Sequence, residues 1–366
     1  DYAGLGDWVA NKERLPRGIK GLSERIEDMG MKFGLWFEPE MVNKDSDLYR
    51  AHPDWILQTP QRNSCHGRNQ FVLDFSRKEV VDCIYEMMYR ILSEAKVSYI
   101  KWDMNRSITE CWSAALPADR QGEVFHRYIL GVYDLYERLN TAFPQILFES
   151  CASGGGRFDP GLLYYAPQGW ASDDTDAAER VKIQYGTSMC YPISSIGSHV
   201  SVVPNHQLNR KTPLHTRANV AYFGTFGYEL DLNKLSEDEI FEVKAQIAFM
   251  KEYREVIQFG SFYRLKSPFE VNETVWMSVS EDKKTALVFW YRERNVVNAD
   301  FTRVRLEGLN PDFLYKNELN GTENYGDELM NLGLITTDST AGEPTDEEEL
   351  CSDYESRIYV LKAETN

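Results

Sequence analysis

The segment YIKWDMNRS, residues 99–107, places charged and aromatic side chains together where an apolar run ends. Lys101 and Asp103 are two residues apart, so on a strand they face the same side. A neighbouring lysine favours the ionised form of an aspartate. An ionised carboxylate beside Trp102 or Trp36 suits a nucleophile that attacks the anomeric carbon of a sugar packed on the aromatic face. The spacing is equally compatible with a structural ion pair at the rim of the fold.

The segment SDDTD, residues 172–176, holds three further acids. Two carboxylates at different strand ends can share acid and base catalysis when their surroundings separate their pKa values. The same residues could bind a metal, although no second Asp/His cluster with suitable spacing accompanies them. They could also cap a helix that begins near Ala177, and we expect at least one of Asp173, Asp174 and Thr175 to do so.

The segment ESCASGGGRFDPG, residues 149–161, contains a run of glycines after a predicted strand. It lacks the GK[ST] of a phosphate-binding P-loop, so phosphate is only weakly indicated. The glycines could equally let backbone N–H groups approach sugar hydroxyls. No histidine accompanies Cys151 in the motif, which argues against a catalytic thiol. We interpret His199 and His206 as structural or rim residues rather than general bases.

These motifs require a scaffold that brings strand ends together. Up to residue 258, apolar runs alternate with helical segments such as 77–94 and 123–141, which predicts a parallel sheet. The apolar runs cover residues 31–40, 97–103, 145–150, 169–174, 193–201 and 222–232. Five of the runs end in or just before an acid and the sixth near His199, a pattern typical of a (β/α)8 TIM barrel. A doubly wound sheet is the alternative, but no G-x-G-x-x-G follows a strand.

The pattern changes after a long amphipathic helix that follows Leu235 and opens with the capping-box pair Ser236 and Glu239. Short β-branched or aromatic runs separated by turns then predict an antiparallel β-sandwich. We therefore expect a catalytic barrel domain over 1–258 and a C-terminal β-sandwich domain over 259–366.

Only six strand candidates precede the second domain, whereas the closed barrel has eight strands. The chain also begins DYAGLGDW, with neither Met nor a helix cap. We therefore expect two strands upstream of residue 1 and an incomplete barrel, about strands 3–8, within these residues.

Composition narrows the class of partner. The 366 residues carry a net charge of −17, which argues against nucleic acid and against anionic membranes. No apolar run approaches the roughly 20 residues of a membrane span. Six cysteines without metal-ligand spacing read as reduced thiols and favour the cytoplasm. We interpret the acidic run 346–349 as a solvated loop.

Several long motifs, in order, resemble the α-galactosidases of glycoside hydrolase family 36. They are FGLWFEPEMV (33–42), HPDWIL (52–57), KWDMNR (101–106), ESCASGGGRFDPG (149–161), SDDTDAAERVKIQYGTS (172–188), SHVSVVPNHQLNR (198–210) and YGDELMNLGL (325–334). The resemblance implies that Asp103 is the nucleophile and Asp173 the acid/base. The implied sugar contacts are Trp36, Arg68, Lys101, Asn105, Cys151, Ser153, Gly154 and Trp170. It also implies an N-terminal β-sandwich and a galactose-binding aspartate pair upstream of residue 1.

The function implied is a retaining α-galactosidase that acts on terminal α-linked galactose, as in melibiose and raffinose, without metal or cofactor. Family members are often tetramers, so a homo-oligomer is expected. A transglycosylase of the raffinose- or stachyose-synthase kind, or an α-N-acetylgalactosaminidase, is the enzyme alternative. The CASGGG loop favours the galactosidase, because an N-acetyl group needs room near the 2-position. A non-catalytic carbohydrate-binding protein is disfavoured because both aspartates are present.

Overall fold

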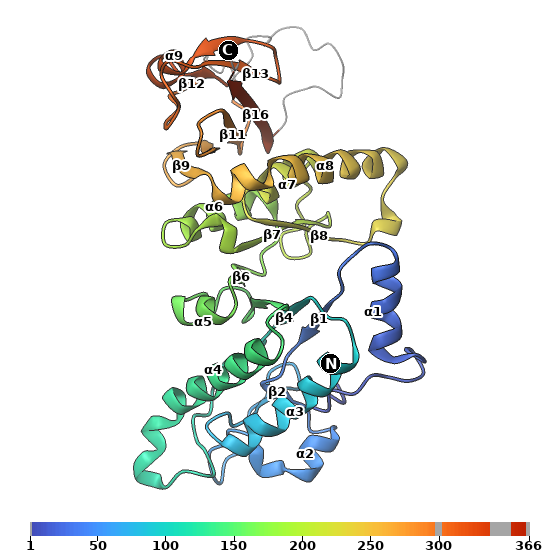
Figure 1. Ribbon diagram of the computed structural model, residues 1–366. Coiled ribbons are helices and arrows are strands. Elements are labelled where there is room, and N and C mark those ends of the chain that lie inside the picture. Colours follow the sequence, from blue (N-terminus) through green and yellow to red (C-terminus); the bar gives the residue numbers. More distant parts are fainter. Residues whose placement is uncertain (1, 297–301, 337–352, 364–366) are drawn as a thin grey trace. The chain divides into compact units, whose positions relative to one another are not determined.

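The computed structural model describes residues 2–296, 302–336 and 353–363, and the chain divides into two compact units. The first unit spans residues 1–173 and the second residues 174–366. Figure 1 shows the elements of each unit in chain order, from blue to red.

The first unit contains a parallel sheet with helices between its strands (Figure 1). Its strands, in sheet order, are β1 (Gly34–Phe37), β4 (Tyr99–Trp102), β5 (Leu147–Ser150) and β6 (Gln168–Trp170). Its helices are α1 (Gly18–Asp28), α2 (Asp47–Ala51), α3 (Lys78–Glu94), α4 (Val124–Ala142) and α5 (Pro160–Tyr165). The short strands β2 (Met41–Val42) and β3 (Phe71–Val72) form a separate antiparallel pair.

The alternation of β4 decides which of its side chains enter the core. Ile100 and Trp102 are buried, and Trp102 stacks on Tyr136 of α4 with ring centroids 3.9 Å apart. The helix presents a buried apolar stripe to this face, as an amphipathic helix does. Tyr99 and Lys101 have the opposite parity and are only partly buried, because successive side chains of a strand point to opposite faces.

The second unit begins with β/α elements and continues into an antiparallel region. The strands β7 (Ile196–Ser201) and β8 (Thr225–Glu229) pair in parallel. The helices are α6 (Ala177–Ser188), α7 (Leu214–Tyr222) and α8 (Glu237–Phe259). The capping box of Ser236 and Glu239 at the start of α8 is confirmed.

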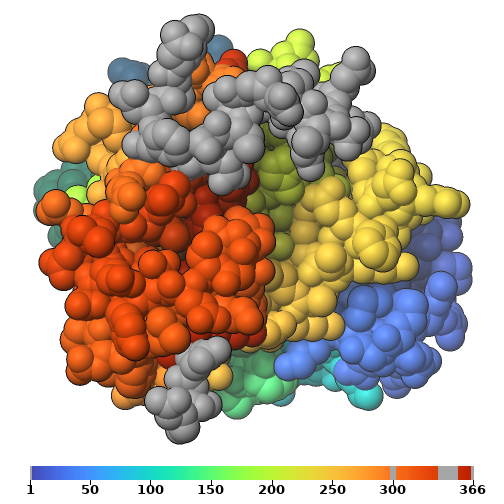
Figure 2. Space-filling model, turned by 90° about the horizontal axis from the view of Figure 1, so that it is seen from above, coloured from blue at the N-terminus to red at the C-terminus, as the bar shows by residue number. Residues whose placement is uncertain are grey.

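The antiparallel sheet has the strand order β14-β13-β16-β11-β10-β9. These strands are β14 (Glu323–Tyr325), β13 (Leu314–Asn317), β16 (Glu355–Ala363), β11 (Thr285–Arg292), β10 (Glu273–Val279) and β9 (Ser261–Lys266). A second small sheet pairs β12 (Arg303–Val304) with β15 (Leu334–Ile335), and α9 covers Gly326–Asn331. Figure 2 shows this region in orange to red, beside the yellow α8.

The central strands of this antiparallel sheet, β10 and β11, are buried on both faces. On β10, Trp276 packs into one core with residues of α7 and α8, whereas Val275 and Met277 pack into another with β12 and β15. A strand buried on both faces reads as a continuous apolar run, which is why ETVWMSVS does not alternate. The expected fold class, a partial TIM barrel followed by an antiparallel β-sandwich, is confirmed.

The sequence missed several short elements and one cap. The pair β2–β3, the strands β13 to β15 and α9 were not expected, because strands of two to four residues carry too little pattern. The expectation that Asp173, Asp174 or Thr175 caps α6 is wrong: the N-cap is Asp176, which accepts a hydrogen bond from the Glu179 N–H.

The sequence analysis interpreted the cysteines as reduced thiols. Cys65, Cys83, Cys111, Cys151 and Cys190 are free thiols. Cys351 and the acidic run 346–349 lie outside the described residues. Among the helices of the described segments, none is long and apolar enough to cross a membrane.

Candidate active site

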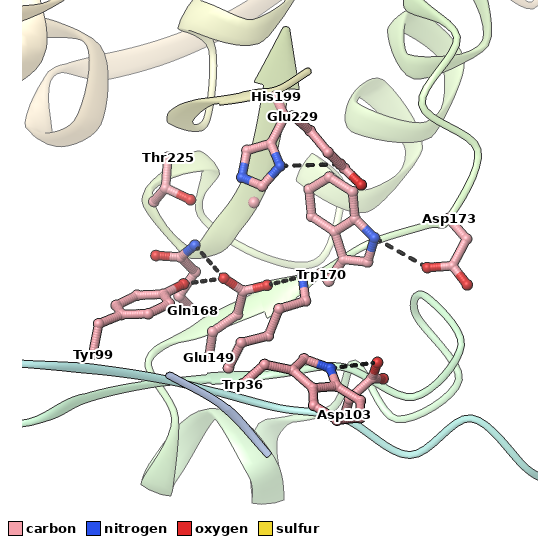
Figure 3. A network of polar contacts seen from close by, with 12 residues as sticks. Trp36, Tyr99, Asp103, Glu149, Gln168, Trp170, Asp173, His199, Thr225 and Glu229 are labelled. Atoms are coloured by element: carbon pink, nitrogen blue, oxygen red, sulfur yellow. Dashed lines mark hydrogen bonds and ion pairs between the residues drawn. The ribbon is translucent and has the colours of Figure 1, made fainter. Parts of the chain in front are cut away.

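The ten residues singled out by the resemblance all lie in the first unit, most of them at the carboxyl ends of its parallel strands. They come from β1, from β4 and the loop after it, and from β6 and the loop after it. Others come from the loop between β5 and α5, residues 151–159, which is the glycine loop. Arg68 comes from the loop before β3. Figure 3 shows how several of their side chains lie with respect to one another.

Asp103 lies in a pocket of hydrogen-bond donors and is only 7% exposed. Its Oδ2 accepts hydrogen bonds from Trp36 Nε1 at 3.1 Å and from Asn105 Nδ2 at 2.7 Å. Its Oδ1 accepts from the Met104 N–H at 2.9 Å. Its own N–H donates to the Phe37 carbonyl, which continues the pairing of β1 with β4 past the last strand residue. Donors that converge on a carboxylate stabilise its charged form and fix its orientation.

The thiol of Cys151 also faces Asp103. Burial raises the pKa of Cys151, and the charge of Asp103 and a hydrogen bond to it raise that pKa further, although Lys101 opposes them. The thiol therefore stays protonated and can donate to Asp103. A catalytic thiolate would need the opposite environment.

Lys101 forms its direct ion pair with Glu149 rather than with Asp103. The parallel register sets Lys101 opposite Glu149 of β5, and Nζ lies 2.7 Å from Oε1. The ammonium also lies 4.5 Å from the ring centroid of Trp170, a cation–π distance. The charge of Asp103 contributes only the last of the causes that raise the pKa of Lys101. The sequence analysis expected the charge of Lys101 to act on Asp103, and the structure adds Glu149 as the direct ion-pair partner that the sequence analysis did not predict.

Asp173 has different surroundings. It is exposed, and its Oδ1 accepts a hydrogen bond from Trp170 Nε1 at 3.1 Å. Trp170 itself is only 4% exposed, so the indole is a fixed donor. Figure 3 shows this contact on one side of the Trp170 ring system and the Trp36–Asp103 contact below it.

The glycine loop after β5 touches both carboxyl-bearing segments. Gly154 has φ +83°, and a Cβ there would lie 2.8 Å from the Asp173 backbone nitrogen and 2.9 Å from Ser172 Cα. Only glycine allows this approach. At the other end of the loop, Cys151 faces Asp103. Ser153, between them, has φ 48° and lies 3.5 Å from Asn105 through its Oγ. The loop thus brings the segments of Asp103 and Asp173 together.

The far end of this loop is fixed by a buried ion pair. Arg157 Nη1 and Nη2 donate to the two carboxylate oxygens of Glu40 at 3.0 and 2.8 Å. Glu40 also accepts from Trp102 Nε1 and from the Tyr128 hydroxyl. The carboxylate is saturated by donors and has no exposed surface, so this acid is structural.

Arg68 lies in the loop before β3. It is exposed and has φ 53°. Its effect within the first unit is electrostatic: burial raises the pKa of Glu38, the charge of Asp103 adds to this, and the charge of Arg68 lowers it. Glu38 in turn accepts the Asn105 N–H at 2.8 Å.

Sequence reasoning missed Glu149, which it noted only as an acid at a strand end. The pair could have been anticipated from the alternation of side chains along the strands. Lys101 and Glu149 occupy matching positions of two adjacent parallel strands. His199, in the second unit, lies 3.3 Å from Glu229.

The metal interpretation of SDDTD receives no support. Asp174 accepts the Asp176 N–H, and Asp176 caps α6 and pairs with Arg210. Within the described ranges, no three or more His, Cys, Asp or Glu side chains gather in a way that could hold a metal ion.

Two family models match the chain. The melibiase model matches residues 1–260, and the model of the glycosyl hydrolase family 36 C-terminal domain matches residues 273–361. Among curated relatives, alpha-galactosidase AgaA of Geobacillus stearothermophilus is 53% identical over 91% of this chain and 46% of its own length. Alpha-galactosidase Mel36A of Lactobacillus acidophilus is 47% identical over 99% of this chain and 48% of its own length. The chain spans about half the length of the curated relatives it matches.

Solved structures of alpha-galactosidases are also similar to this chain. The crystal structure of the alpha-galactosidase from Lactobacillus brevis matches with a TM-score of 0.95 and 49% identity, over 100% of this chain and 49% of that chain. A variant of AgaA from Geobacillus stearothermophilus in complex with raffinose matches with a TM-score of 0.93 and 50% identity, over 99% of this chain and 49% of that chain. Another AgaA variant, with the same score and identity, is in complex with stachyose.

Proposed function

The chain belongs to glycoside hydrolase family 36, the family of melibiases, and from this premise we propose that it carries the catalytic site of a retaining α-galactosidase. Its substrates would be oligosaccharides with terminal α-linked galactose, such as melibiose and raffinose. One observation carries the proposal: the glycine loop touches the segments of both Asp103 and Asp173, and each carboxylate accepts an indole N–H. The α-galactosidases at 53 and 47% identity support it.

In the first step Asp103 is the nucleophile. One of its oxygens bonds to the anomeric carbon as the bond from that carbon to the leaving oxygen breaks, and Asp173 gives that oxygen its proton. In the second step Asp173 takes a proton from water, and the water oxygen displaces Asp103 from the anomeric carbon. Two inversions retain the configuration of the sugar. Hydrogen-bond donors hold the Asp103 carboxyl group in one orientation, whereas the Asp173 carboxyl group is exposed.

The family resemblance also supplies the proposed galactose contacts. Lys101 has an ammonium with three donors and gives one to Glu149, so it can donate to sugar hydroxyls. Trp36 is 45% exposed and offers an apolar face. The remaining proposed contacts are Arg68, Asn105, Cys151, Ser153, Gly154 and Trp170. The raffinose and stachyose complexes of AgaA variants support this class of substrate.

Domain boundaries, location and assembly remain part of the proposal. A catalytic domain over 1–258 and a C-terminal domain over 259–366 are supported by the end of α8 at Phe259 and by the two family matches. A cytoplasmic location is supported by the five free thiols. A homo-oligomer is proposed from family resemblance alone.

The test uses the full-length protein with melibiose, raffinose and nitrophenyl glycosides, and follows the first-formed sugar by proton NMR. We expect α-galactose as the first product and little activity on the α-N-acetylgalactosaminide. First-formed β-galactose would refute retention. A predominant galactosyl oligosaccharide product would instead identify a transglycosylase.

A further inference from the structure

A carboxylate that the catalytic scheme does not use contacts the candidate site through Lys101. The side chain of Glu149 is 3% exposed. Its Oε1 pairs with Lys101 at 2.7 Å, and its Oε2 accepts from Gln168 Nε2 at 3.0 Å and from the Tyr99 hydroxyl. Figure 3 shows the Tyr99 and Gln168 side chains meeting at the same carboxylate oxygen of Glu149. A buried charge is tolerated only when it is paired and hydrogen-bonded in this way.

The partner of this carboxylate differs from that of the other buried acid. Glu40 is bound by both arms of Arg157, whose side chain is 14% exposed, and the pair lies within the core. Lys101 is 27% exposed and lies against the Trp170 ring. A lysine is a flexible chain with a point charge, so it needs a fixed anion to hold one position. Glu149 supplies that anion on one side while the site stays open on the other.

We propose that Glu149 is a positioning residue: it holds the Lys101 ammonium toward galactose hydroxyls and against Trp170, whose indole orients Asp173. This rests on the proposed function, because it assigns Lys101 to the sugar site. Tyr99 and Gln168 fix the carboxylate in turn. Glu149 touches no reacting atom and acts through Lys101.

Electrostatics agree with this geometry. Burial lowers the pKa of Lys101, and the charge of Glu149 and its hydrogen bond overcome that effect, so the net shift is upward. Cys151 and Asp103 also face the ammonium and raise its pKa by smaller amounts. If Glu149 were neutral, the pKa of Lys101 would be lower, because burial lowers it and the main opposing charge would be gone.

The main variant is Glu149→Gln, which keeps the shape and removes the charge. In the full-length protein we expect kcat/KM for nitrophenyl α-galactoside to fall roughly tenfold to hundredfold, mostly through KM. Glu149→Asp, which restores the charge on a shorter stem, should recover part of the loss. The matched control is Glu27→Gln, which neutralises an exposed Glu–Lys pair of the same 2.7 Å length and should not change the kinetics.

A double-mutant cycle with Lys101→Met tests whether Glu149 acts through Lys101. The double variant should match Lys101→Met in kcat/KM within about twofold, because nothing remains for Glu149 to position. It should also melt at a higher temperature than Lys101→Met, which leaves Glu149 buried and unpaired. If Glu149→Gln costs the same factor in both backgrounds, the role is merely structural and the proposal is wrong.

Tyr99→Phe covers the case in which Lys101→Met does not fold. It removes one donor from Glu149 and should raise KM a few-fold with kcat nearly unchanged. Wild-type kinetics in both Tyr99→Phe and Glu149→Gln would overturn the proposal. The proposed function is judged separately, by Asp103→Asn: an inactive Asp103→Asn beside an unaffected Glu149→Gln would refute only the positioning role.

Discussion

Asp103 and Asp173 lie in the same unit and near the same glycine loop, yet their surroundings differ. Asp103 is 7% exposed and accepts hydrogen bonds from the side chains of Trp36 and Asn105 and from the backbone N–H of Met104. Asp173 is exposed and accepts one from Trp170. This difference fits the roles proposed for the two residues. A nucleophile benefits from a fixed charge, whereas an acid/base must gain and lose a proton in each cycle.

The comparison also shows how one loop can serve two different carboxylates. A thiol that burial keeps protonated faces Asp103, and a glycine that admits no side chain faces the Asp173 backbone. The loop therefore contacts Asp103 through a polar side chain and Asp173 through close packing of the backbone. Four predictions test this contrast.

The largest effect is expected for Asp103→Asn. Without a nucleophile the glycosyl-enzyme cannot form, so kcat should fall about 10⁴-fold or more, which corresponds to about 5.5 kcal/mol. Steady-state kinetics on raffinose and on a nitrophenyl α-galactoside would measure it. The melting temperature should change little, and Asp54→Asn at a surface ion pair serves as the control. Turnover near that of the wild type would remove Asp103 from the mechanism.

For Asp173→Ala the expected loss depends on the leaving group. On raffinose, kcat/KM should fall by roughly 10² to 10⁴, the usual contribution of a general acid. On an activated aryl galactoside the loss should be much smaller, because that leaving oxygen is already a stable anion. The control is Asp174→Ala, whose carboxylate supports the turn before α6. If the loss depends on the leaving group in Asp174→Ala but not in Asp173→Ala, the acid/base is Asp174 and our assignment of Asp173 is wrong.

The two indole donors can be compared directly. Trp170→Phe and Trp36→Phe each remove one N–H from a carboxylate, which should cost about tenfold in kcat. We expect Trp170→Phe to act like a mild Asp173 variant, with a larger loss for poor leaving groups. Trp36→Phe should lower turnover of activated and poor substrates alike. If both variants show the same dependence on the leaving group, the two carboxylates do not have the different roles that we propose.

The smallest effect concerns Cys151. Because burial and Asp103 raise its pKa, its thiolate fraction at pH 8 should be very small, and iodoacetamide should modify it slowly. The exposed Cys65 and Cys190 should react first, with activity retained. Mass spectrometry of each cysteine over time provides the measurement. Modification of Cys151 as fast as that of Cys65 would mean that the Asp103 pocket is open.

Local patterns predicted much of this arrangement. Each of the six apolar runs overlaps a parallel strand, and the capping box at Ser236 is present. The resemblance named Asp103 and Asp173, and both lie at strand ends of the first unit. The cap of α6 could not be predicted, because all five residues of SDDTD are chemically suitable N-caps. Asp176 is the cap in a fold that also brings Arg210 to its carboxylate from 34 residues away.

The sequence by itself determined which side chains share a face, because parity along a strand is a local property. It placed Tyr99, Lys101 and Asp103 on one side and Ile100 and Trp102 on the other. Only the tertiary structure decided their partners. Lys101 pairs with Glu149 through the register of two parallel strands, and Gly154 meets Asp173 through loop packing. Such contacts join residues 19 to 48 positions apart, and no local periodicity encodes which donor reaches which acceptor.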